Sequence, residues 1–254
     1  MKRIGVGIAM AACCLCLAQS AHAADAEPEL VTDRPDFTEG STVVPPGSLQ
    51  LESGFTWEDD PDGTDAFNIP ELLLRWGVGR RTELRLGPPQ YFHIRGRGVR
   101  VDGFGDTYLG VKQQLGPWHG WDFAVIPAVS LPTGASALTS DAVDPEVKLT
   151  WARELSERWG ISGMFAFFWP TEGERRNFTW QNTVSLDYKL GPRWSAFFEY
   201  ANALPERGGD QHLLHHGYTY ALTPVSQVDV HFGFGISSAA PDFFIGGGYS
   251  RRFK

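Results

Sequence analysis

Cysteine is almost absent from this sequence, because its three cysteines, Cys13, Cys14 and Cys16, all lie close to the start of a chain of 254 residues. If that start is removed, the chain can form neither a disulfide nor a thiolate metal site. Basic residues are also few, 22 against 30 acidic ones for a formal net charge of -8, which argues against nucleic-acid binding. Beyond position 23, no uncharged apolar run is long enough for a membrane-spanning helix, so a helical membrane bundle is excluded.

The first 23 residues have the features of a secretory signal peptide. Lys2 and Arg3 form a basic start, residues 4–17 are apolar, and Ala21-His22-Ala23 is a small-x-small cleavage site. The alternative is a lipoprotein signal peptide that is acylated at Cys13. The small residues near Cys13 come too early for this, and the small-x-small site that ends at Ala23 fits a cleavage site better. We expect cleavage near Ala23, which removes Lys2 and Arg3 and leaves 20 basic against 30 acidic residues.

The remaining sequence alternates apolar and polar residues with a period of two, which is typical of strands with two different faces. Residues 178–189 show the pattern, with Trp180, Val184 and Leu186 in one phase and Thr183, Ser185 and Asp187 in the other. The 29 glycines and 17 prolines exceed what a helical bundle tolerates, and a hydrophobic content of 42% is too high for a disordered chain. We therefore predict an all-β protein.

We expect about twelve strands, at 47–57, 68–78, 82–90, 103–115, 120–131, 145–154, 158–169, 177–190, 193–202, 212–222, 226–237 and 243–253. Many are about ten residues long, as a tilted strand needs to cross a bilayer. Longer links, such as 58–67, 91–102 and 132–144, alternate with tight ones, such as 79–81 and 191–192. This order is typical of outer-membrane barrels, with short periplasmic turns and longer external loops. The sequence predicts a transmembrane antiparallel up-and-down β-barrel of the Gram-negative outer-membrane type over residues 47–254, with both ends on the periplasmic side.

The two faces of the strands agree with a barrel, because lipid accepts apolar side chains outside and a hydrated lumen accepts polar ones inside. A water-soluble sandwich with a solvated polar face is the alternative. A dry soluble core could not hold so many charges. The predicted lumen-lining residues are Glu71, Arg75, Glu83, Arg85, Asp106, Lys112, Glu146, Lys148, Asp187, Glu199, Asp229, His231 and Arg252.

Two features of the predicted lumen remain open from the sequence. Arg75 and Arg85 could lie opposite Glu71 and Glu83 and create a transverse electric field across a constriction of the lumen. Alternatively, the four charges could pair with one another. Residues 24–46, before the first strand, could stay periplasmic or fold into the lumen as a plug. For a plug, the residues that would find partners among the lumen charges are Asp33, Arg34, Asp36 and Glu39.

A family resemblance follows from several short segments taken in order. These are Thr32–Glu39, Pro46–Gly54, Gly103–Asp106, Leu131–Gly134, Gly217–Thr223, Gln227–Asp229 and Ala240–Asp242. Together they resemble the bacterial family described as "putative MetA-pathway of phenol degradation", often labelled simply "transporter". The resemblance covers nearly the whole mature chain. It implies an outer-membrane barrel that passes or binds small molecules, aromatic or hydrophobic compounds among them.

The predicted function is a narrow channel for the passive passage of small molecules, because twelve strands lie between filled eight-stranded barrels and open porins. The alternatives are a barrel with a structural or binding role, or a lipid-modifying enzyme, without transport. We predict no catalytic residue, cofactor or metal, because His212, His215 and His216 have no adjacent serine and neighbouring strand residues point to opposite faces. The expected partners are outer-membrane lipids, a small-molecule permeant and the barrel-insertion machinery, with no nucleic acid.

Overall fold

The structure is a computed structural model that describes residues 28–254. The predicted signal peptide, residues 1–23, and its cleavage site near Ala23 lie outside the described residues. Within residues 28–254, no helix is long and apolar enough to cross a membrane. The strands are β1 (Leu49–Asp59), β2 (Asp65–Gly77), β3 (Thr82–Gly87), β4 (Tyr91–Gly96), β5 (Val99–Phe104), β6 (Thr107–Gln114), β7 (Asp122–Leu131), β8 (Asp144–Glu154), β9 (Trp159–Phe168), β10 (Thr171–Glu172), β11 (Arg175–Arg176), β12 (Thr179–Lys189), β13 (Trp194–Pro205), β14 (Gln211–Thr223), β15 (Ser226–Gly235) and β16 (Phe243–Phe253).

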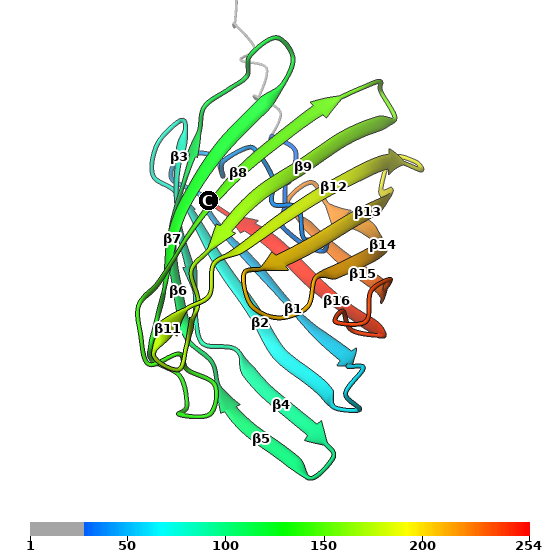
Figure 1. Ribbon diagram of the computed structural model, residues 1–254. Coiled ribbons are helices and arrows are strands. Elements are labelled where there is room, and N and C mark those ends of the chain that lie inside the picture. Colours follow the sequence, from blue (N-terminus) through cyan, green and yellow to red (C-terminus); the bar gives the residue numbers. More distant parts are fainter. Residues whose placement is uncertain (1–27) are drawn as a thin grey trace, which may run out of the picture.

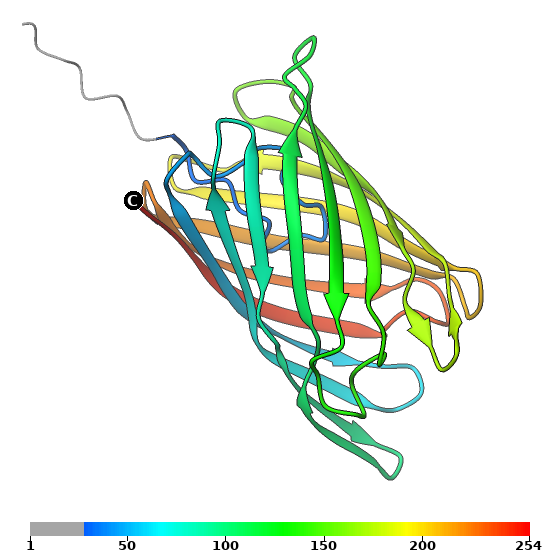
Figure 2. The ribbon, with the colours of Figure 1, turned by 90° about the vertical axis from the view of Figure 1, so that its left-hand side faces the viewer.

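All strands except β10 and β11 belong to one sheet that closes into an antiparallel barrel, and β10 and β11 pair with each other separately (Figures 1 and 2). β1 pairs with β2 along its length and also with β16, in a register that runs from Leu49 opposite Phe253 to Asp59 opposite Phe243. The first and last strands therefore leave no open edge between them, which satisfies the backbone groups that lipid cannot. The predicted twelve-strand antiparallel barrel is confirmed.

One predicted loop is wrong. Residues 91–102 were expected to form a long link, but they contain most of the β4–β5 hairpin, which projects beyond the barrel at the end away from the chain termini (Figure 2). β3 pairs with the second half of β2 and β4 with its first half, so β3 and β4 together face one long strand. The hairpin turns at Arg97 and Gly98, which both have positive φ, as a two-residue turn of this kind requires.

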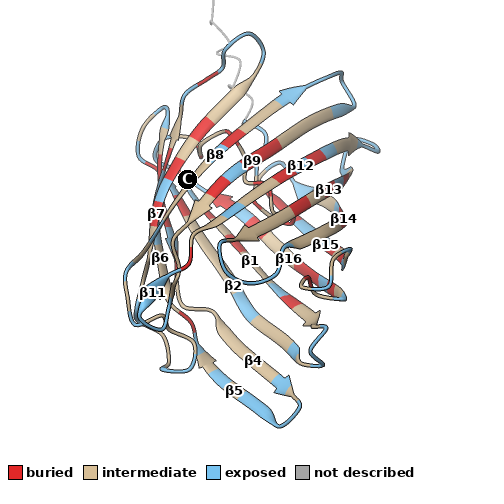
Figure 3. Cartoon of the chain, viewed as in Figure 1, coloured by how far each residue is buried: buried red, intermediate tan, exposed pale blue. Residues whose placement is uncertain are grey.

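The two faces of each strand differ as the period-two pattern predicts. On β12, Thr183 and Ser185 are buried, whereas Val184 and Leu186, which alternate with them, are exposed. The same alternation recurs on the other strands, so that buried and exposed residues form bands on the barrel (Figure 3). The exposed face carries large apolar side chains, including Trp76, Trp180 and Trp194, as expected of a lipid-facing surface.

Candidate functional site in the barrel lumen

Residues 28–47, here called the N-terminal segment, lie inside the barrel rather than outside it (Figure 2). The segment is fixed at its start by Arg252 of β16, whose guanidinium donates hydrogen bonds to the carbonyls of Pro28 and Glu29. It ends where the amide of Gly47 donates to the carbonyl of Gly77 on β2 at 2.7 Å. The segment therefore forms a loop that enters and leaves the lumen at the end with the short turns.

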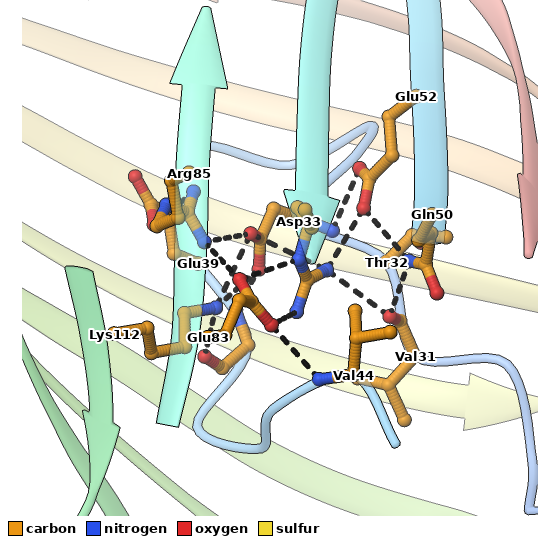
Figure 4. Close-up of polar contacts among 12 residues, drawn as sticks. Val31, Thr32, Asp33, Glu39, Val44, Gln50, Glu52, Glu83, Arg85 and Lys112 are labelled. Atoms are coloured by element: carbon orange, nitrogen blue, oxygen red, sulfur yellow. Dashed lines mark hydrogen bonds and ion pairs between the residues drawn. The ribbon is translucent and has the colours of Figure 1, made fainter. Parts of the chain in front are cut away.

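A cluster of buried charges holds the first half of the segment (Figure 4). The carboxylate of Asp33 lies 2.9 Å from Lys112 Nζ, 2.6 Å from Arg85 Nη1 and 3.3 Å from Arg75 Nη1. Arg75 also binds Glu83 and Glu52, both at 2.8 Å. The strands β2, β3 and β6 therefore meet one carboxylate of the segment, and Arg75 joins them to Glu52 of β1. We call Asp33, Glu52, Arg75, Glu83, Arg85 and Lys112 the anchor cluster.

Pairing explains how these charges can be buried. Arg75, Glu83 and Lys112 are fully covered, and a buried ion without a partner costs several kcal/mol. The sequence left two alternatives for Arg75 and Arg85, a transverse field or pairing with carboxylates. The structure shows pairing, because both guanidinium groups contact Glu83 directly. Burial by itself raises the pKa of Asp33, but Arg75, Lys112 and Arg85 outweigh burial and hold that pKa well below its ordinary value.

Backbone groups of the segment complete the cluster. Glu52 accepts hydrogen bonds from the amides of Asp33 and Arg34, at 2.9 and 3.1 Å. Glu83 accepts one from the amide of Val44 at 2.8 Å, and Lys112 donates to the carbonyl of Gly40 at 2.8 Å. These contacts satisfy main-chain groups that have no partner in a strand, as buried backbone requires.

Arg34 connects the segment to β2 and β15, which lie on either side of β1 and β16. Its guanidinium binds Glu71 of β2 and, at 3.2 Å, Asp229 of β15. A Cβ built at Gly54 or Gly248 would lie less than 2.6 Å from this guanidinium, so these two glycines on β1 and β16 provide the space for it. Burial lowers the pKa of Arg34, and the charges of Asp229 and Glu71 more than compensate and raise it.

Glu39 forms a second, smaller ion-pair group. Its carboxylate lies 2.7 Å from Arg85 Nη2 and 2.6 Å from Lys148 Nζ, and Lys148 also binds Glu146 at 2.9 Å. Burial raises the pKa of Glu39, but Arg85 and Lys148 lower it to about 2. Close by, Ser41 donates a hydrogen bond to Thr150 of β8 at 3.0 Å.

The innermost turn of the segment, residues 36–38, lies against Glu199 of β13. The amides of Phe37 and Thr38 donate to its carboxylate at 2.9 and 2.8 Å, and the hydroxyl of Thr38 donates at 2.7 Å. That hydroxyl is also 2.6 Å from Thr183 Oγ1 of β12. His215 of β14 is hydrogen-bonded to Glu199 at 2.8 Å and packs against the ring of Phe37.

Asp36 differs from the other acidic residues of the segment, because it has no cationic partner within residues 28–254. Burial and the nearby carboxylates of Glu199 and Asp187 raise its pKa well above the ordinary value. Asp36 therefore opposes the burial of the segment when it is ionised.

The structure places the predicted lumen and plug residues in different groups. It brings Asp33, Arg34 and Glu39 together with Glu71, Arg75, Glu83, Arg85, Lys112, Glu146, Lys148 and Asp229. His231 lies 3.0 Å from His215, and Asp187 lies 3.4 Å from Ser162 Oγ, without an ion pair. Asp106 instead accepts hydrogen bonds from the amides of Gly134 and Ser140, in the link that follows β7.

Several contributors were not among the predicted site residues. Gln50, Glu52, Thr183 and His215 are buried and contact the segment. Gln50, Glu52 and Thr183 belong to the polar phase of their strands, so the alternation places them on the correct face. Nothing in the sequence shows which inward polar residues meet the segment, because that depends on how deep the segment lies.

Two cavities remain beside the segment. The larger, of about 360 Å³, extends from Ser156 and Arg158 in the β8–β9 turn to Thr38 and Phe197. The smaller, of about 320 Å³, lies between Glu29, Leu30 and the ends of β12–β15. Their volumes are at the lower end of the range of small-molecule sites.

A closed antiparallel barrel with a charged interior and an apolar exterior defines the class of outer-membrane-type β-barrels. The solved structures that resemble it belong to the same class. An outer membrane channel from Pseudomonas putida F1 aligns with a TM-score of 0.66 at 13% identity, over 84% of this chain and 98% of that one. The NanC porin aligns with a TM-score of 0.57 at 8% identity, over 80% and 98% of the two chains. The KdgM porin aligns with a TM-score of 0.55 at 12% identity, over 81% and 99%.

The family model described as "Putative MetA-pathway of phenol degradation" matches residues 32–253. The chain therefore belongs to this family, and the resemblance seen in its sequence is confirmed. No curated protein sequence matches the chain.

Proposed function

We propose that the protein is an outer-membrane channel through which small molecules pass by passive diffusion. The observation that carries the proposal is a closed barrel whose charged interior keeps two cavities beside the N-terminal segment. Membership of a family named for phenol degradation and the likeness of its fold to channels and porins support the proposal. Hydrophobic or aromatic compounds are the proposed permeants.

In this function, the N-terminal segment acts as a plug that narrows the lumen. Its contacts with β1, β2, β3, β6, β8, β12, β13 and β15 support this role. The lumen of a twelve-strand barrel is already narrower than that of a porin, so a segment inside it restricts the size of what can pass. The proposed site consists of the lumen-lining residues and plug residues that the sequence predicts.

The proposed topology in the cell follows from the barrel. Outer-membrane barrels place their short turns in the periplasm. The N-terminal segment and both cavities would then open towards the periplasm, while the β4–β5 hairpin would lie at the cell surface. Outer-membrane lipids and the insertion machinery are the proposed partners.

Recordings from the refolded protein in planar lipid bilayers test the function. We expect small single-channel conductances that decrease when an aromatic solute such as phenol is added, because the solute and the ions share one narrow path. A matched solute too large to enter, such as a long dextran, should not change the conductance. If bilayers that contain correctly folded protein carry no current, the channel is contradicted, and a structural or binding role or an enzyme activity on lipids becomes the better explanation.

A further inference from the structure

The two sides of the lumen hold the N-terminal segment unequally. On β1, β2, β3, β6 and β8, the segment binds charged or polar side chains on every strand. Within residues 28–254, no hydrogen bond or ion pair joins the segment to β9, or to β7 between β6 and β8. On β12 and β13 it is held inside the lumen by Thr183 and Glu199 only, with an exposed contact of 3.9 Å between Glu29 and Lys189 at the rim. We call β9, β12 and β13 the open wall.

The larger cavity lies along this open wall. It is bounded on one side by residues of the segment, including Pro35, Asp36 and Thr38, and on the other by Gly160, Ser162 and Ser195 of the wall. Within residues 28–254, the strands that carry the anchor cluster, β1, β2, β3 and β6, contribute no residue to the lining of this cavity. The cavity therefore lies to one side of the segment, away from the anchor cluster.

The cavity ends where the innermost turn of the segment contacts the open wall. Thr183 is the fifth residue of the eleven in β12, and Glu199 is the sixth of twelve in β13, so both lie near the middle of their strands. Thr38 contacts both of them. Asp36, the residue next to Phe37, is half-buried and has no cationic partner within residues 28–254, which weakens the hold on this turn but not on the anchor cluster.

We propose that permeants pass between the N-terminal segment and the open wall, and that the contact of Phe37 and Thr38 with Thr183 and Glu199 closes this route at the middle of the lumen. The route opens when residues 36–38 move away from β12 and β13 while Asp33 stays bound to β2, β3 and β6. This inference rests on the proposed function, and it assigns the path and its closing contact within that channel.

A reversible cross-link tests the route. The hydroxyl oxygens of Thr38 and Thr183 are 2.6 Å apart, close to the ~2 Å bond of a disulfide, and the chain from residue 24 contains no cysteine. In the double variant Thr38→Cys/Thr183→Cys, we expect oxidation to abolish the single-channel current and reduction with dithiothreitol to restore it. Loss of maleimide-reactive thiol reports that the bond has formed, and the heat-dependent gel mobility of the barrel reports that it is folded.

The matched control fixes the same segment to its other side. Ser41 and Thr150 have hydroxyl oxygens 3.0 Å apart, and Thr150 lies on β8, outside the open wall. Oxidation of Ser41→Cys/Thr150→Cys should reduce the current much less than oxidation of Thr38→Cys/Thr183→Cys, although Ser41 also lines the larger cavity. The route is overturned if the oxidised Thr38–Thr183 pair conducts like its reduced form, or if both cross-links reduce the current equally.

A probe of the wall itself gives a second test that needs no cross-link. Ser162 lines the cavity, and Leu186 on the neighbouring strand is exposed on the outside of the barrel. We expect Ser162→Trp to reduce the current strongly and Leu186→Trp to leave it unchanged. Equal currents in both variants would contradict the proposed route. The absence of current in the unaltered protein would instead contradict the proposed channel function.

Discussion

The anchor cluster and the open wall are two regions of one lumen that use different residues for different purposes. Around Asp33, three cations and two further carboxylates are buried together, and their pairing leaves no charge exposed to lipid. On the open wall, Gly160, Ser162, Asp187 and Phe197 are among the residues that line a cavity, and within residues 28–254 only Thr183 and Glu199 reach the segment deep in the lumen. The difference suggests that the segment is held firmly on one side and can move on the other.

Replacing Asp33 should have the largest effect. The variant Asp33→Ala leaves Arg75, Arg85 and Lys112 without one partner, and breaking a buried ion pair costs about 3–5 kcal/mol. We expect the segment to leave the lumen, so that a protease added to the periplasmic side cleaves within residues 28–46. Thr32→Ala is the control, because its hydroxyl contacts only Gln227 and the carbonyl of Arg34. Equal resistance of Asp33→Ala and the unaltered protein would show that the cluster does not hold the segment.

Replacing Glu199 should have an intermediate effect that is confined to the open wall. In Glu199→Gln, an amide group replaces one of the oxygens that accept from Phe37 and Thr38, which costs about 1–3 kcal/mol. We expect a higher single-channel current while residues 28–46 stay protected from protease. Cleavage of the segment in this variant would mean that the two regions do not act separately.

Acid should release the anchored side. The pKa of Asp33 is held well below its ordinary value, and that of Glu39 is about 2. Both carboxylates therefore stabilise the binding of the N-terminal segment in the lumen above the ordinary carboxyl pKa. This stabilisation is lost as the pH falls towards 2. Protease protection of residues 28–46 should therefore decrease between about pH 4 and 2. Glu52 and Glu83 face the same cations. Protection that is unchanged at about pH 2 would contradict the ion-pair anchor.

Asp36 should respond in the opposite direction. Its pKa is raised, so its contribution to docking is present at low pH and is lost as the pH rises through the raised value. The variant Asp36→Asn removes the charge, and we expect a lower open probability than in the unaltered protein at neutral pH. The two proteins should become alike in acid, which pH-dependent bilayer recordings can measure.

The smallest expected effect comes from a single hydroxyl. Thr38→Ala removes the hydroxyl contacts with Thr183 and Glu199 but keeps the amide bond to Glu199. One hydrogen bond contributes about 0.5–1.5 kcal/mol, or roughly 2- to 10-fold in the open population. Ser41→Ala removes a hydroxyl contact on β8 and should not change the open probability. A similar increase in both variants would place the closing contact elsewhere.

The sequence predicts the barrel well because alternation is a property of each strand alone. Val184 and Ser185 point to opposite faces whatever their neighbours are. The phase of each residue in the alternation therefore shows whether it faces lipid or the lumen. The β4–β5 hairpin was missed since Gly96, Arg97 and Gly98 are equally typical of a loop, and its strands are only six residues long. Its pairing with β2 is a long-range contact that local pattern does not reveal.

For the N-terminal segment, the sequence predicts only the kind of side chain that it contacts in the lumen, not the individual residues. Burial of charge requires that Asp33 and Glu39 find cations if the segment enters the barrel, and the inward phase supplies Arg75, Arg85 and Lys112. The segment has no periodicity, so nothing fixes its depth or decides that Glu39 rather than Asp36 meets Lys148. The role of Thr38 and the position of the cavity depend on that depth, and they become visible only in three dimensions.

The most direct test of the central claim, that residues 28–47 occupy and narrow the lumen, is the single-channel conductance after residues 24–44 are deleted. Heat-dependent gel mobility identifies the fraction with a folded barrel, and only that fraction is recorded. We predict a conductance well above that of the unaltered protein, because the segment no longer fills the space between the anchor cluster and the open wall. An unchanged conductance in folded barrels would contradict the claim.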